Sequence, residues 1–153
     1  MQDALVATEG RKIMFEVPGK PGFKGRPRPY HQQGHTGLKN TDQTVRTENL
    51  IRAIFQLKFR DFTPIAGPVK LSFRAFFPIP QKTPKKKRAA MLAGDVPHTK
   101  APDASNILKA IEDALNTVAY LDDRQISDYG ESCKRYSDRP RLEIEIEELE
   151  VVE

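Results

Sequence analysis

Between residues 103 and 123, the sequence spaces several aspartates and one lysine so that they could act together on a phosphate. At about 100° per residue, Asn106, Lys109 and Asp113 fall within about 60° of one another on a helix, away from its apolar residues. Asp103 lies at the start of this helix, and the pair Asp122–Asp123 follows in the turn after it. Mg²⁺ is held by one or two carboxylates together with water and phosphate oxygens. The spacing therefore allows metal-assisted hydrolysis of a phosphodiester, with the lysine steadying the phosphate.

The same residues also have a structural explanation. Asp103 can cap the helix, Lys109 and Asp113 can form a solvated face, and the pair Asp122–Asp123 can form a turn. Spacing alone favours this structural explanation over a metal site.

The hydropathy pattern predicts the elements that would position these residues. Strands are predicted at 12–17, 69–77, 126–136 and 141–151, helices at 44–62, 82–94 and 103–115, and a basic loop in the Pro- and Gly-rich segment 18–37. Strands and helices do not alternate regularly, which predicts an α+β fold with a mixed or mostly antiparallel sheet and helices packed on it. We expect residues 1–11 to be a frayed terminus and residues 12–153 to form a single domain.

Composition argues against several classes of protein. The 153 residues contain no apolar run near the roughly 20 residues that cross a bilayer, so no membrane partner is expected. The N-terminus lacks the pattern of a secretory signal, and the single Cys133 allows neither an internal disulfide nor a zinc spacing. A cytoplasmic location fits best. No nucleotide cofactor is expected either, because PGKPGFKG lacks the spacing of a phosphate loop.

Charge is distributed unevenly along the chain, although the net charge is only +4. Residues 1–100 hold 19 Lys and Arg against 7 Asp and Glu, whereas residues 101–153 hold 6 against 14. The basic residues that could neutralise DNA phosphates form two clusters, namely Lys20, Lys24, Arg26 and Arg28, and then Lys85, Lys86, Lys87, Arg88 and Lys100. No helix-turn-helix or zinc-finger pattern accompanies them, so we expect recognition of DNA backbone and shape. The glutamates expected on the solvent face of the last strand, away from DNA, are Glu143, Glu145, Glu147, Glu148 and Glu150.

The sequence resembles the RusA-type Holliday junction resolvase family in two stretches, KAPDASNILKAIEDALN (100–116) and YLDDRQI (120–126). The resemblance covers about residues 12–147. It implies a homodimer that binds branched DNA, in particular four-way junctions. With Mg²⁺, or Mn²⁺ as a substitute, it would resolve these junctions by paired symmetrical nicks during DNA recombination and repair. Carried over by position, the resemblance assigns catalysis to Asp103, Asp123 and Lys109. It assigns metal binding to Asp103, Asp123 and Asp122, and supporting roles to Ser105, Asn106 and Asp113.

One position departs from the family pattern, because Ser105 stands where many members have a second aspartate. A neutral hydroxyl is a poorer Mg²⁺ ligand than a carboxylate. Three explanations remain open: a tolerated variant of the site, a slower enzyme, or a protein that binds junctions without cutting them. A basic protein that contacts something other than DNA is a further alternative. Because Asp103, Lys109 and Asp123 are intact, the endonuclease hypothesis leads.

Overall fold

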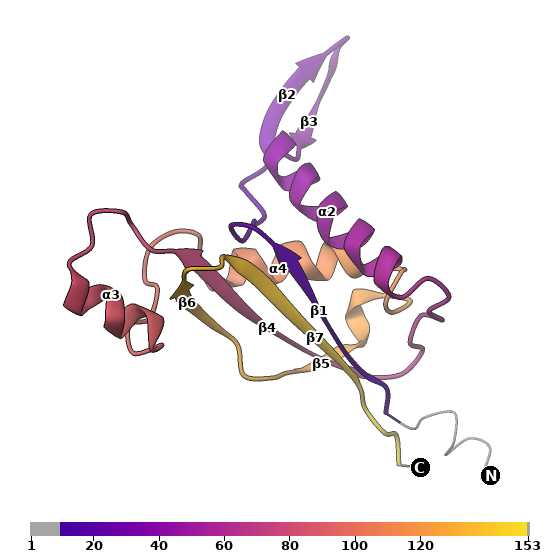
Figure 1. Ribbon diagram of the computed structural model, residues 1–153. Helices are drawn as coiled ribbons and strands as arrows, with labels where there is room; N and C mark the ends of the chain where they lie inside the picture. The colour runs from indigo at the N-terminus through magenta and orange to yellow at the C-terminus, as the bar shows by residue number, and fades with distance from the viewer. Residues whose placement is uncertain (1–9, 153) are drawn as a thin grey trace.

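The computed structural model describes residues 10–152 and is built around a sheet in which β1 (Lys12–Pro18), β7 (Arg141–Glu148) and β4 (Val69–Pro78) lie side by side (Figure 1). β7 is antiparallel to both neighbours, and Ile144 pairs with Phe15 on one side and with Phe73 on the other. Residues directly opposite each other on neighbouring strands point to the same face of the sheet, so these three side chains are buried together. The strands predicted at 12–17, 69–77 and 141–151 are confirmed, the last one ending at Glu148.

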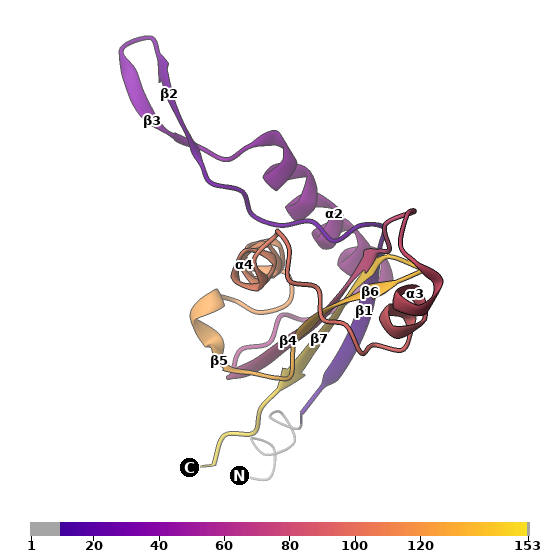
Figure 2. The ribbon, with the colours of Figure 1, turned by 90° about the vertical axis from the view of Figure 1, so that its left-hand side faces the viewer.

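Two helices cover the apolar face of this sheet (Figure 2). α2 (Asp42–Lys58) packs against β1 and against α4 (Ala104–Leu115). α4 buries Ile107, Ile111 and Leu115 completely, as its predicted apolar stripe requires. α2 begins before the predicted residue 44 because the Thr41 side chain caps it by accepting a hydrogen bond from the backbone N–H of Thr44.

The segment 126–136 is not the single strand that was predicted. β5 (Ile126–Tyr129) and β6 (Cys133–Ser137) pair in parallel with the first and second halves of β4. Between them, the Ser132 hydroxyl accepts a hydrogen bond from the backbone N–H of Phe73 at 3.0 Å. At this point the partner of the β4 backbone is a side chain and not the backbone of a neighbouring strand. The hydropathy pattern does not reveal such a substitution. The sheet is mixed, as predicted for the α+β fold.

The segment 18–37, predicted as a loop, contributes most of a hairpin that projects away from the sheet (Figures 1 and 2). β2 (Arg28–Gln32) and β3 (His35–Lys39) are antiparallel, and Gln33 and Gly34 turn between them with φ of 51° and 79°. Such positive φ values are those of a two-residue hairpin turn. The loop prediction is confirmed for residues 19–27 and wrong for residues 28–37, because a two-stranded ribbon has only edge strands, which tolerate a proline such as Pro29.

α3 (Lys85–Leu92) lies at one end of the sheet, next to β6, and buries only Met91. It confirms the short basic helix predicted at 82–94. After it, the link to α4 is anchored by His98, whose ring stacks on Phe77 with a centroid separation of 3.9 Å. Burial lowers the pKa of His98. The backbone N–H of His98 also donates to the Lys134 carbonyl at 3.0 Å, so this link is fixed to β6.

The sheet face away from α2 and α4 carries paired charges. Glu143 bonds Arg74 at 3.0 Å and Arg141 at 2.9 Å. Glu148 was expected in solvent but is buried on the other face, in phase with Ile144 and Ile146, and its carboxylate bonds the Arg11 guanidinium at 3.1 Å. Through Glu143, β7 therefore neutralises basic residues of its own sheet on the face opposite to α4 (Figure 2).

The terminus predicted to be frayed, residues 1–11, lies mostly outside the described residues, but Arg11 is held to β7 because its carbonyl accepts from the Glu148 N–H at 2.8 Å. Among the helices within residues 10–152, none is both long and apolar enough to cross a membrane.

Candidate functional site

The start of α4 presents the first predicted catalytic residue to solvent. Asp103 is the N-cap, and its backbone carbonyl accepts from the N–H groups of Asn106 and Ile107 at 3.0 and 3.2 Å. Its exposed carboxylate makes no hydrogen bond or ion pair within residues 10–152, and Ser105 and Asn106 are exposed beside it. This carboxylate is therefore available to a ligand.

The segment that leads into Asp103 is held by a lysine from β6. The Lys134 ammonium donates to the carbonyl oxygens of Lys100 and Pro102, each at 2.6 Å. Pro102 is buried, whereas Asp103 is exposed. The chain is thus fixed just before the helix, and the position of the Asp103 backbone does not depend on its own carboxylate.

Near the end of α4, Asp113 is the centre of a cluster of charges. The Asp113 carboxylate bonds Lys24 from the segment after β1 at 2.7 Å and Lys109, one turn earlier, at 3.7 Å. Glu48 of α2 faces the same cluster, and its Oε2 is buried without a hydrogen-bond partner. Burial, followed by the nearby Asp113 charge, raises the pKa of Glu48, while Lys24 opposes this shift. Asp113 is therefore half-buried and ion-paired, and is not part of a purely solvated face.

The far end of α4 is followed by the 3₁₀ turn η1 (Asp123–Gln125), for which Asp122 is the N-cap. Asp122 Oδ1 accepts from the backbone N–H of Arg124 at 2.8 Å and from its guanidinium at 3.1 Å. These bonds, the backbone one first, lower the pKa of Asp122. Gln125 bonds back to the Asp122 N–H and donates to the carbonyls of Ile65 and Gly67. The spacing of the motif YLDDRQI thus builds a capping box that ties η1 to the segment before β4.

Asp123 lies beside a pair of tyrosines that bond the last turns of α4. The Tyr120 hydroxyl donates to the Glu112 carbonyl at 2.8 Å, and the Tyr129 hydroxyl donates to the Glu112 carboxylate. This carboxylate bond, assisted by burial, raises the pKa of Tyr129 to about 12. The negative charge of Asp123 contributes to the raised pKa of both phenols, so Asp123 is their neighbour.

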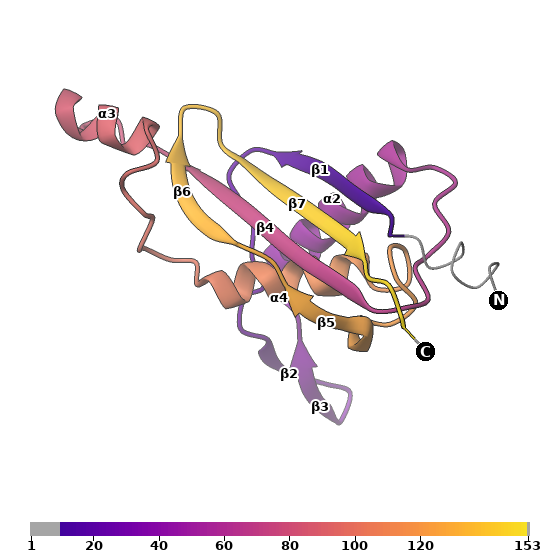
Figure 3. The ribbon, with the colours of Figure 1, turned by 90° about the horizontal axis from the view of Figure 1, so that it is seen from below.

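The predicted site residues thus fall into separate groups along α4. The helix begins beside β6, and η1 lies beyond its other end (Figures 1 and 3). From Asp103 to Glu112, the helical rise alone separates the two ends by about 13 Å. Within residues 10–152, no three Asp, Glu, His or Cys side chains gather as a set of metal ligands. Asp103 and Asp123 therefore belong to elements at opposite ends of α4.

The comparison with protein families decides the relationship of this chain to known nucleases. The sequence profile of the family described as endodeoxyribonuclease RusA matches residues 18–147. The chain belongs to the RusA family. YqaN of Bacillus subtilis strain 168, which is described as an uncharacterized protein, is 33% identical over 139 residues, covering 90% of this chain and 96% of YqaN. The family resemblance found in the motifs at 100–116 and 120–126 is confirmed, and family membership implies an endodeoxyribonuclease.

The basic residues expected to contact DNA in this RusA-family chain lie on two surfaces. Lys20, Arg26 and Arg28 are exposed along the segment that leads into the hairpin, whereas Lys24 is committed to Asp113. Lys85, Lys86 and Lys87 are exposed on α3. The remaining two, Arg88 and Lys100, lie near them, and Arg88 is bonded to the Pro80 carbonyl. The start of α4 lies between the hairpin and α3 (Figure 2).

Sequence reasoning missed several residues of this RusA-family site. Lys134 and Glu48 come from β6 and α2, and no spacing in the sequence connects either of them to α4. Glu112 could have been found, because it lies within the motif at 100–116 and is followed by the aromatic Tyr120 and Tyr129. What the sequence did not indicate is that both hydroxyls bond that one residue.

Proposed function

We propose that this protein is a Mg²⁺-dependent endonuclease that resolves four-way DNA junctions by paired nicks in recombination and repair. The observation that carries the proposal is the free carboxylate of Asp103 at the start of α4, between two basic surfaces. Basic side chains in flexible or exposed positions attract DNA phosphates. A carboxylate in their midst is where a divalent cation would meet the scissile phosphate.

The separation of Asp103 and Asp123 determines how the metal would be held. A divalent ion needs one or two carboxylates besides phosphate and water oxygens, so Asp103 of one copy and Asp123 of a second copy fit the requirement. We therefore propose a homodimer with two composite sites, each completed by both chains. Leu121 and Tyr129 support this arrangement, because they expose 58% and 56% of their surface next to Asp123. Apolar surface of this kind favours a protein contact there.

The bound ion would supply an activated water and would stabilise charge on the phosphodiester. Lys109 would contact the scissile phosphate, since its ammonium is half-exposed and only loosely paired with Asp113. Asp113 would orient Lys109 and, through Lys24, the basic segment after β1. We assign Asp122 to the structure of η1, because its Oδ1 is already committed to Arg124.

Cleavage of a labelled synthetic four-way junction tests this function. Wild type should nick two opposed strands symmetrically in Mg²⁺ or Mn²⁺ and should be inactive in EDTA. Asp123→Asn should abolish cutting while gel-shift binding of the junction remains. Asp128→Asn is a matched control, because this exposed carboxylate on β5 bonds only the neighbouring Ser127 within the described chain. Undiminished cutting by Asp123→Asn would show that the assignment is wrong.

A second function is favoured by Ser105, which stands exposed where a carboxylate would strengthen the metal site. In this alternative the protein binds branched DNA and does not turn over. Wild type would then shift the junction without nicking it, and Ser105→Asp would gain cutting. If the endonuclease proposal holds, wild type cuts and Ser105→Asp only changes the rate.

A further inference from the structure

The hairpin β2–β3 has little structural role in the folded body. Every residue of both strands is exposed except Gly37, and the strands contact mainly each other. An isolated two-stranded hairpin is marginally stable in water. A projecting arm of this kind is explained most simply by a ligand that it meets outside the body, and its side chains indicate the chemistry of that ligand.

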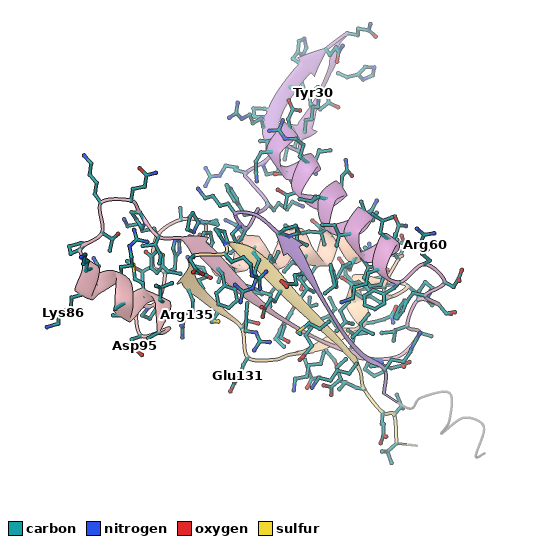
Figure 4. All side chains as sticks on the ribbon, viewed as in Figure 1. Tyr30, Arg60, Lys86, Asp95, Glu131 and Arg135 are labelled. Atoms are coloured by element: carbon teal, nitrogen blue, oxygen red, sulfur yellow. The ribbon has the colours of Figure 1, made fainter. Side chains whose placement is uncertain are left out.

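Tyr30 is the aromatic residue of this arm (Figure 4). It pairs across the ribbon with Gly37, and a Cβ on that glycine would lie 3.0 Å from Cε1 and Oη of the tyrosine. The missing side chain at Gly37 therefore gives the tyrosine ring its place against the opposite strand. The ring is held on that side, yet Tyr30 keeps 43% of its surface exposed.

A hollow of about 400 Å³ opens beside Tyr30 at the base of the hairpin, where the ribbon meets α2. The polar side chains around it include Arg28, Lys39, Asn40, Asp42 and Gln43. Arg28 and Lys39 are register partners on the two strands, so two cations stand together at its mouth. The hollow thus combines an aromatic ring, two cations, one carboxylate and two amide side chains able to donate and accept hydrogen bonds.

Charge decides between nucleic acid and protein as the occupant. From Val17 to Thr41 the chain has no Asp or Glu, but it has five Lys and Arg and both hairpin histidines. Asp42, the one carboxylate of the hollow, is the first residue of α2, where the helix N-terminus offsets its charge. A polyanion is the complement of such a segment. Aromatic side chains among basic residues bind nucleobases by stacking, and stacking requires a base that has left the helical stack. Paired bases in a duplex do not offer a free face.

We propose that this hollow binds one unpaired nucleotide of the branched DNA, with its base stacked on Tyr30 and its phosphate between Arg28 and Lys39. This inference rests on the proposed function, because it names the part of the junction that the arm grips. The strand-exchange point is where a junction can release a base from its stack. The arm would therefore select the branch point over uninterrupted duplex.

A double cycle of protein and DNA changes tests the stacking contact. The probes are a four-way junction with one unpaired nucleotide at the branch point, the same junction with an abasic residue there, and a duplex of equal length. Binding is measured in EDTA, so that no cutting occurs. Tyr30→Ser should bind the base-containing junction about tenfold more weakly than wild type and the duplex equally well. Wild type should bind the abasic junction more weakly than the base-containing junction by the same factor. Tyr30→Ser should bind the abasic junction no more weakly than wild type does, because both changes remove the same contact.

Three further variants separate stacking from charge and folding. Tyr30→Phe should retain the affinity of wild type, because the ring remains. Gly37→Ala should reproduce the loss, because its Cβ would displace the ring. Arg28→Gln should weaken binding to all three DNAs and reduce its salt dependence. Thermal unfolding of Tyr30→Ser should match wild type, since Tyr30 lies outside the core.

The outcomes distinguish this inference from the proposed function. If wild type prefers the junction to the duplex but Tyr30→Ser weakens the base-containing and abasic junctions equally, the nucleotide site is wrong and junction binding stands. The same conclusion follows if Tyr30→Ser has no effect. If wild type does not prefer the junction at all, the proposed function and this site both fail.

Discussion

The two ends of α4 present aspartates in opposite ways. At the start, Asp103 caps the helix through its backbone, and its carboxylate is free of partners among residues 10–152. At the far end, Asp122 binds Arg124 twice and closes a capping box with Gln125. A carboxylate without protein partners can accept a cation without loss of structure, whereas a carboxylate in a cap cannot. Of these two motif aspartates, Asp103 is thus available to a ligand, whereas Asp122 holds the chain.

The same comparison separates Asp123 from its neighbour Asp122. Asp123 begins η1 but is not its cap, and it lies close to the phenols of Tyr120 and Tyr129. Adjacent positions therefore differ in role because the capping box uses one side chain and leaves the next one out. This difference predicts distinct consequences for the aspartates of the motif.

The largest expected effect belongs to Asp103→Asn. The amide keeps the shape and the backbone cap but removes the charge that would hold Mg²⁺, so junction cleavage should fall about a thousandfold or more. The free energy of unfolding should stay within about 0.5 kcal/mol of wild type. Single-turnover cleavage and urea denaturation measure the two quantities. A variant that cuts normally, or one that unfolds, would remove Asp103 from the proposed site.

A smaller effect is expected at Asp113, in the last turn of α4. Asp113→Ala should lower the free energy of unfolding by about 2 kcal/mol, because it leaves the partly buried Lys24 ammonium without its partner. Lys109→Met should change it by less than about 0.5 kcal/mol, since that pair is longer and more exposed. Urea denaturation of both variants measures the two losses in the free energy of unfolding. Equal losses would mean that Lys109, rather than Lys24, is the important partner of Asp113.

Asp122→Ala should affect stability more than chemistry. Its lowered pKa means that the Asp122 cap contributes stability above the ordinary pKa of 3.8, and this contribution is lost as pH falls through the lower folded value. The variant should melt at a lower temperature at pH 7 and should lose less stability on acidification than wild type. Junction cleavage should persist. Unchanged melting together with lost cleavage would place Asp122 at the metal, as the motif alone predicts.

The smallest effect concerns Glu48, whose pKa is raised chiefly by burial. The folded state then binds more protons than the unfolded state above the ordinary value of 4.5, so the Glu48 contribution to stability falls as pH rises through this window. Glu48→Gln should flatten this part of the stability profile above pH 4.5. Urea denaturation at a series of pH values measures how the free energy of unfolding depends on pH. A steeper decline in the variant would contradict the assignment.

The sequence predicted the elements whose apolar residues repeat regularly. The stripe containing Ile107, Ile111 and Leu115 located α4, and the alternation along β4 and β7 located the centre of the sheet. Prediction from the sequence failed where a side-chain hydrogen bond or a tight turn, and not a regular apolar repeat, determines the structure. Ser132 interrupts the strand predicted at 126–136, and the turn at Gln33–Gly34 makes a hairpin from a segment that composition assigns to a loop.

The candidate site was predictable only in part, because the motif gives residue types but not their partners. Asp103 and Lys109 are where the periodicity of a capped helix puts them. Spacing suggested that Asp103 and the pair Asp122–Asp123 could converge, yet Asp103 caps the start of α4, whereas Asp122 and Asp123 form the turn η1 beyond its other end. The partners Lys24 and Glu48 come from other elements, and only folding brings them to Asp113.

The most direct test of a composite site mixes two inactive variants. Asp103→Asn and Asp123→Asn, each inactive alone, are unfolded together, refolded and assayed on the labelled junction in Mg²⁺. If each site takes Asp103 from one copy and Asp123 from the other, the mixture should nick single strands at about a quarter of the wild-type rate, because half of the dimers are mixed and each has one intact site. A mixture as inactive as its components would show that each chain builds its site alone, which would contradict a site shared between two chains.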